Sequence, residues 1–370
     1  MTHGESVETV GIAGAGTMGS AISALFANAG YEVVLYDISR EALEKARKRN
    51  EKEHLLELER AGLKRRERLE IKYTTELSDL RDCDFLLESI KEDLRAKIDF
   101  FKRAKEVCRG ALFATNTSSY MPSEISEGAG VNVFLFHFSN PPIEMPLVEI
   151  SGTGDPSKYV EYAQKIGKRP VVLKKQCRGA VINRMLCALG CSLGYALKLG
   201  SPYEIDATVK QLGFRYGFFE WLDRMGLDVC LDVLKSMGEV YQRFSSDAAP
   251  IVKFAEEVLR TFVDSGKLGK KSGEGFYRWS GEEPVPEPVE NYADITLLIA
   301  VTVNEAHRIV EDGIADKETV NEVWKLATLY PAGPFELAEA IGYEALIERL
   351  KEAYEETGAE LFKPVIRGVS

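Results

Sequence analysis

The sequence predicts an α/β fold in which a doubly wound domain with a parallel sheet is followed by two all-α domains. Three observations lead to this prediction. A glycine-rich turn joins an apolar strand to a helix near the start of the chain. Short apolar runs then alternate with helical segments as far as about residue 175. Beyond that point helical periodicity prevails, and part of the helical region repeats.

The first domain begins with a strand, turn, helix and strand. Residues 7–12 alternate as a strand, a helix follows to Gly30, and a second strand occupies 31–37. Such a unit implies parallel strands, because the helix returns the chain to the same edge of the sheet. A long, charged helical stretch is predicted over 40–68. Further strands are predicted at 84–88, 111–114, 133–137, 147–150 and 170–173, with helices such as 94–107 between them.

The rest of the chain is predicted to contain two copies of a small helical domain. Phe219-Glu220 and Phe335-Glu336 occupy matching points of two similar stretches, and a glycine follows six residues after each glutamate. A glycine-rich loop at 265–279 and a Pro/Glu-rich linker separate the copies. The predicted domains are 1–176 for the nucleotide-type domain, 177–280 for the first helical copy, 281–290 for the linker and 291–370 for the second helical copy.

The composition is that of a soluble globular enzyme, with 45% hydrophobic and 28% charged residues in a chain of 370. The net charge of −11 argues against general binding to nucleic acid or to an anionic membrane. We see no apolar run of the roughly 18 residues that span a bilayer, and no export signal. Six cysteines without a CxxC pair favour reduced thiols over disulfides or zinc. We therefore expect a cytoplasmic protein without a metal site.

Gly14, Gly16 and Gly19 form a G-x-G-x-x-G pattern between the first strand and the first helix. The first glycine permits a tight turn, and the second lets the backbone approach a pyrophosphate. The third allows close packing of helix and strand. Thr17 and Met18 belong to the same turn. The pattern alone is also compatible with a stripe of packing glycines. Its place between a strand and a helix indicates a Rossmann-type dinucleotide site.

Asp37 bears on whether the site binds NAD or NADP. It ends the second strand, 18 residues after Gly19. A carboxylate in this place accepts hydrogen bonds from a ribose 2′-hydroxyl and repels a 2′-phosphate. Arg40 lies close by, and its positive charge would instead favour a 2′-phosphate. On balance the sequence predicts NAD as the cofactor.

His137 follows the apolar run 133–136, and Glu149 lies twelve residues later. A histidine in such surroundings is commonly only a hydrogen-bonded residue near the core. The alternative is an acid–base pair, because imidazole has an ordinary pKa of about 6.5 and a carboxylate on its far nitrogen fixes the tautomer. The acid–base interpretation requires the strands at 133–137 and 147–150 to be neighbours.

Five stretches of the sequence occur in the order and spacing found in the L-3-hydroxyacyl-CoA dehydrogenase family. They are VGIAGAGTMGSAIS, ATNTSS, HFSNPP with MPLVEI, GAVINRML and GKLGKKSGEGFYRW. The resemblance covers essentially the whole chain. The second helical copy, with YPAGPFELAEAIG intact, resembles the family's forms that carry a duplicated C-terminal domain. Those forms include the dehydrogenase part of multifunctional fatty-acid oxidation enzymes.

This resemblance implies a role for each matching residue. The family's catalytic histidine falls on His137 and its partner glutamate on Glu149. Its substrate-binding serine and asparagine match Ser118 and Asn183. For these two the alternatives are a serine in a turn after a strand and an amide on a helix surface. The family's cofactor contacts fall on Glu92 and Lys97, and Asn116 lies in the matched ATNTSS stretch.

The pair formed by Glu92 and Lys97 could also be an ordinary surface charge pair. Two positions depart from the family's pattern near the histidine. Ser139 stands where the family usually has an aromatic residue, and Pro142 where it often has valine. Neither departure removes a catalytic side chain.

The reaction that the resemblance implies is the reversible, NAD-dependent oxidation of an L-3-hydroxyacyl-CoA to the 3-oxoacyl-CoA. Residues 40–68 hold eleven Lys or Arg against seven Glu, which suits a dock for coenzyme A phosphates or simply a solvated helix. One alternative function is the oxidation of a free hydroxy acid, of sugar-acid or carnitine type, on the same scaffold. Another is a non-catalytic NAD-binding protein.

The two helical copies also suggest how the protein assembles. Single-copy members of the family are understood to pair through their helical domains, so one copy alone would leave an apolar face. We expect copy one (179–280) to pack on copy two (291–370) in one chain. This internal pseudo-dimer would be a monomer or a homodimer. In a true homodimer, the alternative, the copies would pair between chains.

Overall fold

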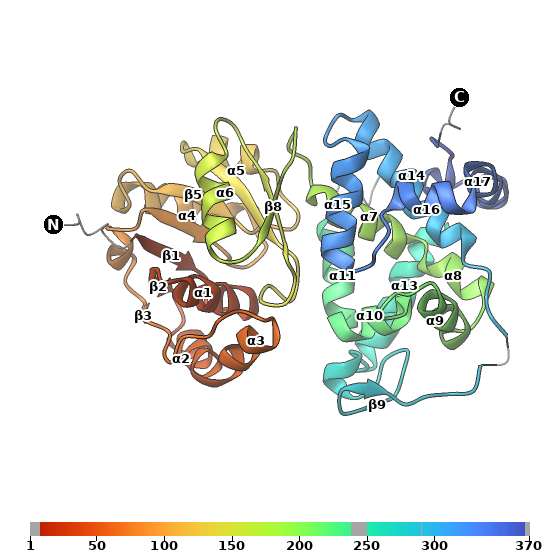
Figure 1. Ribbon diagram of the computed structural model, residues 1–370, viewed down its shortest axis with the longest axis horizontal. Coiled ribbons are helices and arrows are strands. Elements are labelled where there is room, and N and C mark those ends of the chain that lie inside the picture. The colour runs from red at the N-terminus through yellow and green to blue at the C-terminus, as the bar shows by residue number, and fades with distance from the viewer. Residues whose placement is uncertain (1–7, 238–249, 290, 367–370) are drawn as a thin grey trace. The chain divides into compact units, whose positions relative to one another are not determined.

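The computed structural model describes residues 8–237, 250–289 and 291–366, and the chain divides into two compact units, Met1–Ala180 and Val181–Ser370 (Figure 1). Parts of several predicted segments, namely residues 7, 238–249, 290 and 367–370, lie outside the described residues. In the described ranges no single helix is long and apolar enough to cross a membrane; α7 (Ala180–Cys191) and α8 (Leu193–Leu199) pass that test only as a bent pair. The same ranges contain no group of His, Cys, Asp and Glu that could hold a metal ion.

The first unit is built on an eight-stranded sheet with the order β3-β2-β1-β4-β5-β6-β7-β8. The order reverses between β1 and β4, and such a switch point is where open α/β sheets bind ligands. The predicted doubly wound sheet is therefore confirmed. The strands are β1 (Thr9–Ala13), β2 (Glu32–Tyr36), β3 (Ile71–Thr74), β4 (Phe85–Glu88), β5 (Leu112–Thr115), β6 (Val133–Phe138), β7 (Leu147–Ser151) and β8 (Arg169–Val172).

Helices cover both faces of this sheet (Figure 1). One face packs against α1 (Thr17–Ala29) and α6 (Ser157–Lys165). The other packs against α4 (Leu94–Val107) and α5 (Pro122–Ala129). The central strands β4 and β6 are buried at every position. Burial on two sides explains why these strands read as continuous apolar runs in the sequence.

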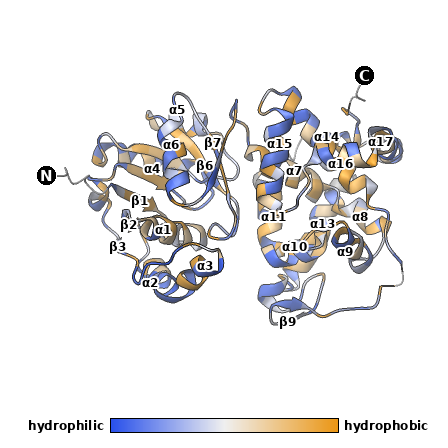
Figure 2. Ribbon diagram, viewed as in Figure 1, coloured by the Kyte–Doolittle hydropathy of each residue, from blue (hydrophilic) through white to orange (hydrophobic). Residues whose placement is uncertain are grey.

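The charged stretch predicted as one helix over 40–68 is helical only to residue 60. It comprises α2 (Arg40–Lys48), a π-helical turn (Arg49–Glu53) and α3 (His54–Arg60). Gly62 has a φ of +74°, which ends the helical path. The next strand, β3, was not predicted, because IKYT is short and lies among charged residues at the edge of the sheet. Figure 2 shows the contrast between the mainly hydrophobic α1 and the more hydrophilic α2.

One pair of strands corrects the prediction of a parallel sheet. Strand β7 runs antiparallel to β6, whereas the other neighbours in this sheet are parallel. Residues 139–146 connect β6 to β7 without a helix. A parallel crossover needs a dozen or more residues, so this short connection can join only antiparallel strands.

The second unit is helical, and one apolar core contains residues from both predicted copies, such as Leu234 and Leu350. A two-stranded hairpin, β9 (Trp279–Ser280) with β10 (Glu283–Pro284), reaches into the segment that was predicted as a linker. Short 3-10 turns occur in this unit at Lys270–Ser272 and Glu360–Phe362, and in the first unit at Leu77–Leu80. Besides α7 and α8, the described helices of this unit are α9 (Pro202–Gln211), α10 (Phe218–Met225), α11 (Leu227–Ser236), α13 (Pro250–Asp264), α14 (Thr296–Glu311), α15 (Lys317–Thr328), α16 (Pro334–Ile341) and α17 (Tyr343–Thr357).

Candidate active site

The glycine-rich turn lies between β1 and α1. The surroundings of its three glycines differ, and they show what each glycine does. Gly14 has a φ of +103°, and a Cβ there would lie 2.3 Å from the carbonyl oxygen of Ser89. A Cβ on Gly19 would lie 1.8 Å from the carbonyl oxygen of Gly14. At Gly16, by contrast, no atom lies within 4 Å of where a Cβ would be. Gly14 and Gly19 therefore serve the packing of the turn, and Gly16 borders open space that a ligand can approach.

The start of α1 provides a binding site for an anion. Gly16 is the N-cap of this 13-residue helix, and no side chain caps its first turn. Thr17 is exposed and Met18 is half-buried at the same end. Backbone N–H groups and the positive end of the helix dipole favour a phosphate at such a place. This end of α1 suits the pyrophosphate of a dinucleotide.

Asp37 lies just after β2 and binds the backbone of the glycine-rich turn and of the residue that caps α2. Its Oδ2 accepts a hydrogen bond from the N–H of Ala15 at 2.7 Å, and its Oδ1 accepts one from the N–H of Ser39 at 2.8 Å. Ser39 in turn caps α2, whose first residue, Arg40, is exposed. Each carboxylate oxygen has more than one lone pair, so Asp37 can still accept a ribose hydroxyl.

His137 and Glu149 face each other on adjacent strands. The antiparallel register pairs His137 of β6 directly with Glu149 of β7. Nδ1 of the ring lies 2.9 Å from Oε2 of the carboxylate, and the two residues are 4% and 0% exposed. Because a carboxylate accepts hydrogen bonds, this contact favours the tautomer of the neutral ring in which Nδ1 carries the hydrogen and Nε2 the lone pair. The two strands are thus neighbours, as the acid–base interpretation requires.

Asn116 connects the strand that carries His137 to the middle of the sheet. Its Oδ1 accepts a hydrogen bond from the N–H of Phe138 at 2.9 Å, and its Nδ2 donates to Oγ of Ser89 at 3.4 Å. Asn116 follows β5, and Ser89 follows β4. One amide therefore joins the ends of three strands beside the histidine.

Lys97 is buried and lies between two carboxylates, the exposed Glu92 and the buried Glu88. The sequence analysis missed Glu88. Nζ of Lys97 lies 2.7 Å from Oε1 of Glu88 and 3.1 Å from Oε2 of Glu92. Lys97 is 1% exposed, so the surface charge pair considered as the alternative does not apply. Burial lowers the pKa of Lys97, but the two carboxylates outweigh it and raise that pKa above its usual value.

Glu92 also holds the loop that contains Ser118. Its Oε1 accepts hydrogen bonds from the Thr117 hydroxyl at 2.5 Å and from the N–H of Ser118 at 3.1 Å. Ser118 follows β5 and is half-buried. The structure therefore brings Ser118, Glu92 and Lys97 together, whereas the sequence could relate them only through the family's pattern.

Glu88 was missed because it reads as the polar end of an apolar strand. It is fully buried, and besides Lys97 it accepts hydrogen bonds from the Thr115 hydroxyl and the N–H of Ile90, each at 2.7 Å. A signal was present in the sequence. A carboxylate that ends a short strand of a parallel sheet, after three apolar residues, lies at the edge where ligands bind.

Lys168 is a second buried charged residue, after Glu88, that the sequence analysis missed. It is 5% exposed and donates hydrogen bonds of 2.9 Å to the carbonyl oxygens of Ile143 and Met145. These carbonyls belong to the connection between β6 and β7, so Lys168 supports the loop behind His137. Burial lowers the pKa of Lys168 to about 8.

Asn183 lies in the second unit, on α7, and is half-buried. Its predicted role toward the substrate or His137 stays a prediction. The predicted residues of the first unit, in contrast, gather at the carboxyl edge of the parallel strands. They are Gly14, Gly16, Thr17, Met18, Gly19, Asp37, Glu92, Lys97, Asn116, Ser118, His137 and Glu149.

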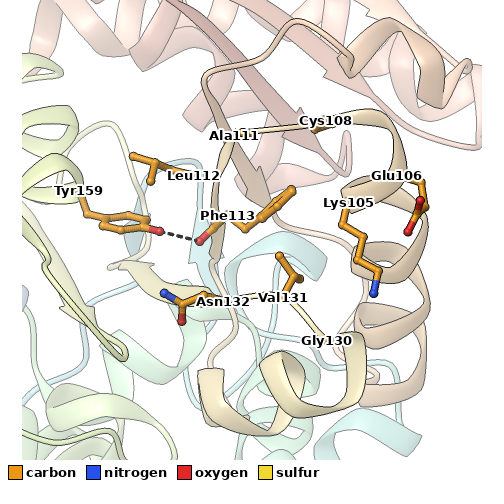
Figure 3. A pocket seen from close by; sticks show the side chains of 11 residues that line it. Lys105, Glu106, Cys108, Ala111, Leu112, Phe113, Gly130, Val131, Asn132 and Tyr159 are labelled. Carbon is orange, nitrogen blue, oxygen red and sulfur yellow. Dashed lines mark hydrogen bonds between the residues drawn. The ribbon is translucent and has the colours of Figure 1, made fainter.

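Two hollows lie elsewhere in the first unit. One, of about 460 Å³, lies at the opposite edge of the sheet, where the hydroxyl of Tyr159 donates to the carbonyl oxygen of Phe113 (Figure 3). It contains none of the predicted site residues. The other, of about 450 Å³, lies between β3 and the charged stretch, with Arg47, Arg68 and Lys72 in its wall. Its wall also contains Glu51 and Glu67.

Comparison with known proteins identifies the family. Residues 9–177 match the family model of the 3-hydroxyacyl-CoA dehydrogenase NAD binding domain. Residues 179–279 and 296–368 match that of the 3-hydroxyacyl-CoA dehydrogenase C-terminal domain. These matches extend over nearly the whole chain.

Individual relatives differ in how much of their length the chain covers. The peroxisomal bifunctional enzyme of Cavia porcellus is 28% identical over 95% of this chain, which spans only 54% of that protein. The probable 3-hydroxybutyryl-CoA dehydrogenase of Deinococcus radiodurans is 31% identical over 73% of this chain and 99% of its own length. The chain thus spans about half the length of this bifunctional enzyme and of the alpha subunits of the fatty acid oxidation complex that it also matches.

Solved structures likewise differ in how much of this chain they cover. The 3-hydroxybutyryl-CoA dehydrogenase from Escherichia coli has a TM-score of 0.80 at 23% identity, with 97% of each chain covered. It shows that the fold is shared along the whole chain. The (S)-3-hydroxybutyryl-CoA dehydrogenase from Ralstonia eutropha has a TM-score of 0.61 at 30% identity and covers 74% of this chain and 100% of its own.

Proposed function

Since the chain belongs to the 3-hydroxyacyl-CoA dehydrogenase family, we propose that it interconverts an L-3-hydroxyacyl-CoA and the 3-oxoacyl-CoA with NAD as cofactor. One observation carries the proposal. The buried His137–Glu149 pair lies at the same edge of the sheet as the glycine-rich turn. A proton acceptor and a dinucleotide site in one place are what the oxidation of a secondary alcohol requires.

In the oxidation, the hydroxyl group loses its proton and the carbon that bears it loses a hydride. His137 accepts the proton at Nε2, because Glu149 keeps the hydrogen of the neutral ring on Nδ1. Glu149 then stabilises the imidazolium that forms. In the reverse direction the same imidazolium returns the proton to the oxygen. Ser118, on the loop held by Glu92, donates a hydrogen bond to the reacting oxygen.

The residues around the turn fit NAD. Bound NAD supplies the hydride acceptor. The open space at Gly16 and the uncapped start of α1 support binding of the pyrophosphate there. Asp37, after β2, would accept the ribose hydroxyl groups and disfavour a 2′-phosphate.

Coenzyme A is the proposed carrier of the substrate. The hollow beside the charged stretch has Arg47, Arg68 and Lys72 in its wall, and such cations bind phosphates. Relatives from D. radiodurans and R. eutropha, named as 3-hydroxybutyryl-CoA dehydrogenases, favour the same class of substrate. A cytoplasmic location stays part of the proposal. It is supported by the buried thiols of Cys83, Cys108, Cys187, Cys191 and Cys230, as expected for reduced cysteines.

The test is the oxidation of NADH with acetoacetyl-CoA compared with free acetoacetate. We expect kcat/KM to be on the order of 10² or more larger for the thioester, because contacts remote from the reacting carbon raise the rate. A His137→Gln sample purified in parallel controls for contaminating dehydrogenases. Equal or higher efficiency with acetoacetate would favour the free hydroxy acid. A wild-type protein that binds NADH but turns over neither compound would contradict the proposal.

We further propose that the helical unit contains two copies, 177–280 and 291–370, joined by 281–290. Matching hydrogen bonds support it. Asp206 on α9 accepts from the N–H of Phe219 at 2.9 Å, and Asn321 on α15 accepts from the N–H of Phe335 at 3.0 Å. A side chain of one helix thus caps the start of the next in both copies.

Contacts between the copies support internal pairing. The rings of Phe214 and Tyr330 stack with their centroids 3.6 Å apart, and the hydroxyl of Tyr330 donates to the carbonyl oxygen of Leu212 at 2.7 Å. The shared apolar core also draws on both copies. Truncation after residue 280 should therefore give an aggregating or newly dimeric protein. A well-behaved, active monomer from this truncation would rule out internal pairing, and light scattering on the full chain distinguishes a monomer from a homodimer.

A further inference from the structure

A buried ion pair connects the first helix of copy one to the first helix of copy two. Arg184 on α7 is 4% exposed, and Glu305 on α14 is fully buried. Nε of Arg184 donates to Oε1 of Glu305 at 2.7 Å, and a terminal nitrogen lies 2.6 Å from the same oxygen. The other terminal nitrogen donates to Asp312 at 2.9 Å, where α14 ends. The guanidinium is therefore held along two edges by residues of copy two.

The position of this contact on α7 matters because Arg184 directly follows Asn183. Consecutive residues of an α-helix point about 100° apart, so whatever fixes the direction of Arg184 also fixes that of Asn183. Side-chain atoms lie about 6 Å from the helix axis, and a rotation of α7 by about 20° would move the Asn183 amide by about 2 Å.

The connection that enters α7 has an unusual backbone. Gly179 and Ala180 have φ values of +75° and +52°, a left-handed conformation that an alanine seldom adopts. This connection determines where the helix begins. The link from Arg184 to Glu305 and Asp312 fixes the rotation of α7 about its axis, because a buried guanidinium that would leave both carboxylates on moving tolerates little displacement.

We propose that Glu305 of copy two is a positioning residue for Asn183, acting through Arg184. Copy two would then serve the reaction directly in addition to completing the core. The inference rests on the proposed function, in which Asn183 contacts the substrate. It goes beyond that function by assigning a specific task in the reaction to the second copy.

The main experiment is a double-mutant cycle on Glu305→Gln and Asn183→Ala with acetoacetyl-CoA and NADH. Glutamine keeps the size of the side chain but removes the charge that orients Arg184. We expect Glu305→Gln to lower kcat/KM by roughly 10-fold to 100-fold, since displacements of about 1 Å can cost that much. The dissociation constant for NADH should stay unchanged. In the Asn183→Ala background the same substitution should have almost no further effect.

Glu220→Gln is the matched control. Glu220 is a buried glutamate of the same unit, 2% exposed and ion-paired with Arg224 and Lys210, but it lies on α10. Its substitution should lower the unfolding temperature and leave kcat/KM unchanged. A merely structural role of Glu305 would give this same pattern.

Several results would overturn the inference. One is a folded Glu305→Gln variant with wild-type kcat/KM, and another is a loss that multiplies with that of Asn183→Ala. If Glu305→Gln does not fold, Glu305→Asp, which keeps the charge but is one methylene shorter, enters the same cycle with the same expected pattern. A wild-type protein inactive toward acetoacetyl-CoA contradicts the proposed function, whereas an active wild type with an unaffected variant contradicts only the role of Glu305.

Discussion

Two buried carboxylates at the carboxyl edge of the sheet differ from two in the helical unit in what they bind. At the carboxyl edge of the sheet, Glu149 binds the ring of His137, and Glu88 binds the ammonium group of Lys97. In the helical unit, Asp206 and Asp223 each accept two backbone N–H hydrogen bonds. A carboxylate bound to the backbone fixes the path of the chain. One bound to a titratable side chain sets the charge and orientation of that side chain, as an active site requires.

Asp206 is an example of a buried carboxylate that binds mainly the backbone. Its two oxygens accept hydrogen bonds from the N–H groups of Phe219 and Glu220 and from the hydroxyl of Tyr277. Burial raises the pKa of Asp206 to about 6, although these hydrogen bonds oppose the rise. At the start of α16, the neutral Asn321 accepts the corresponding hydrogen bond from the N–H of Phe335, so such a cap does not require a charge.

The largest expected effect tests the functional side of this comparison. His137→Gln should lower kcat by about 10³ or more, because glutamine cannot accept the proton. Binding of NADH, followed by fluorescence titration, should remain at the wild-type level. Turnover unchanged by the substitution would show that the buried histidine is structural.

Glu149→Gln should have the next largest effect. It leaves His137 in place but replaces a carboxylate acceptor by a neutral amide, so kcat should fall by about 10². Thermal unfolding measured alongside separates the two interpretations. A large drop in the unfolding temperature with wild-type kcat in the folded fraction would assign Glu149 to the structural group.

Asp206→Asn tests the structural side through pH. The folded-state pKa lies above the unfolded one, so the contribution of Asp206 to stability is complete below about pH 4 and is lost as pH rises through about 6. Relative to Asp206→Asn, the wild type should therefore lose about 2 kcal/mol of unfolding free energy between pH 4 and pH 7. Denaturant unfolding of both proteins at the two pH values measures this. A pH-independent difference, or a loss of kcat/KM in the variant, would break the comparison.

Lys168 sharpens the comparison, because it lies in the first unit but binds only backbone carbonyls in the described contacts. Lys97 has a raised pKa beside two carboxylates, whereas burial lowers that of Lys168 to about 8. The unfolded state therefore binds more protons between about pH 8 and 10.5, and stability rises with pH in that window. Between pH 7.5 and 9.5 the wild type should gain about 2 kcal/mol relative to Lys168→Met in denaturant unfolding. A difference in unfolding free energy between the two proteins that stays constant with pH would contradict a lowered pKa of Lys168.

Much of the site could be found from the sequence, because its residues follow local patterns. The glycines of the turn, Asp37 after the second strand and His137 after an apolar run can each be recognised from neighbours in the chain. Glu88 and Lys168 could not be assigned in this way. Their partners lie 9 and 27 residues away for Glu88, and 25 and 23 residues away for Lys168. No spacing rule connects such distant positions.

By itself the sequence determined the doubly wound sheet and the helical character of the remainder, since apolar periodicity depends only on local burial. It also determined the family, through motifs whose order runs along the chain. Only the tertiary structure decided that β7 runs antiparallel to β6, and this register places Glu149 opposite His137. Only the tertiary structure likewise pairs Arg184 with Glu305, 121 residues away. Strand register and buried ion pairs depend on how distant segments pack, which local composition does not specify.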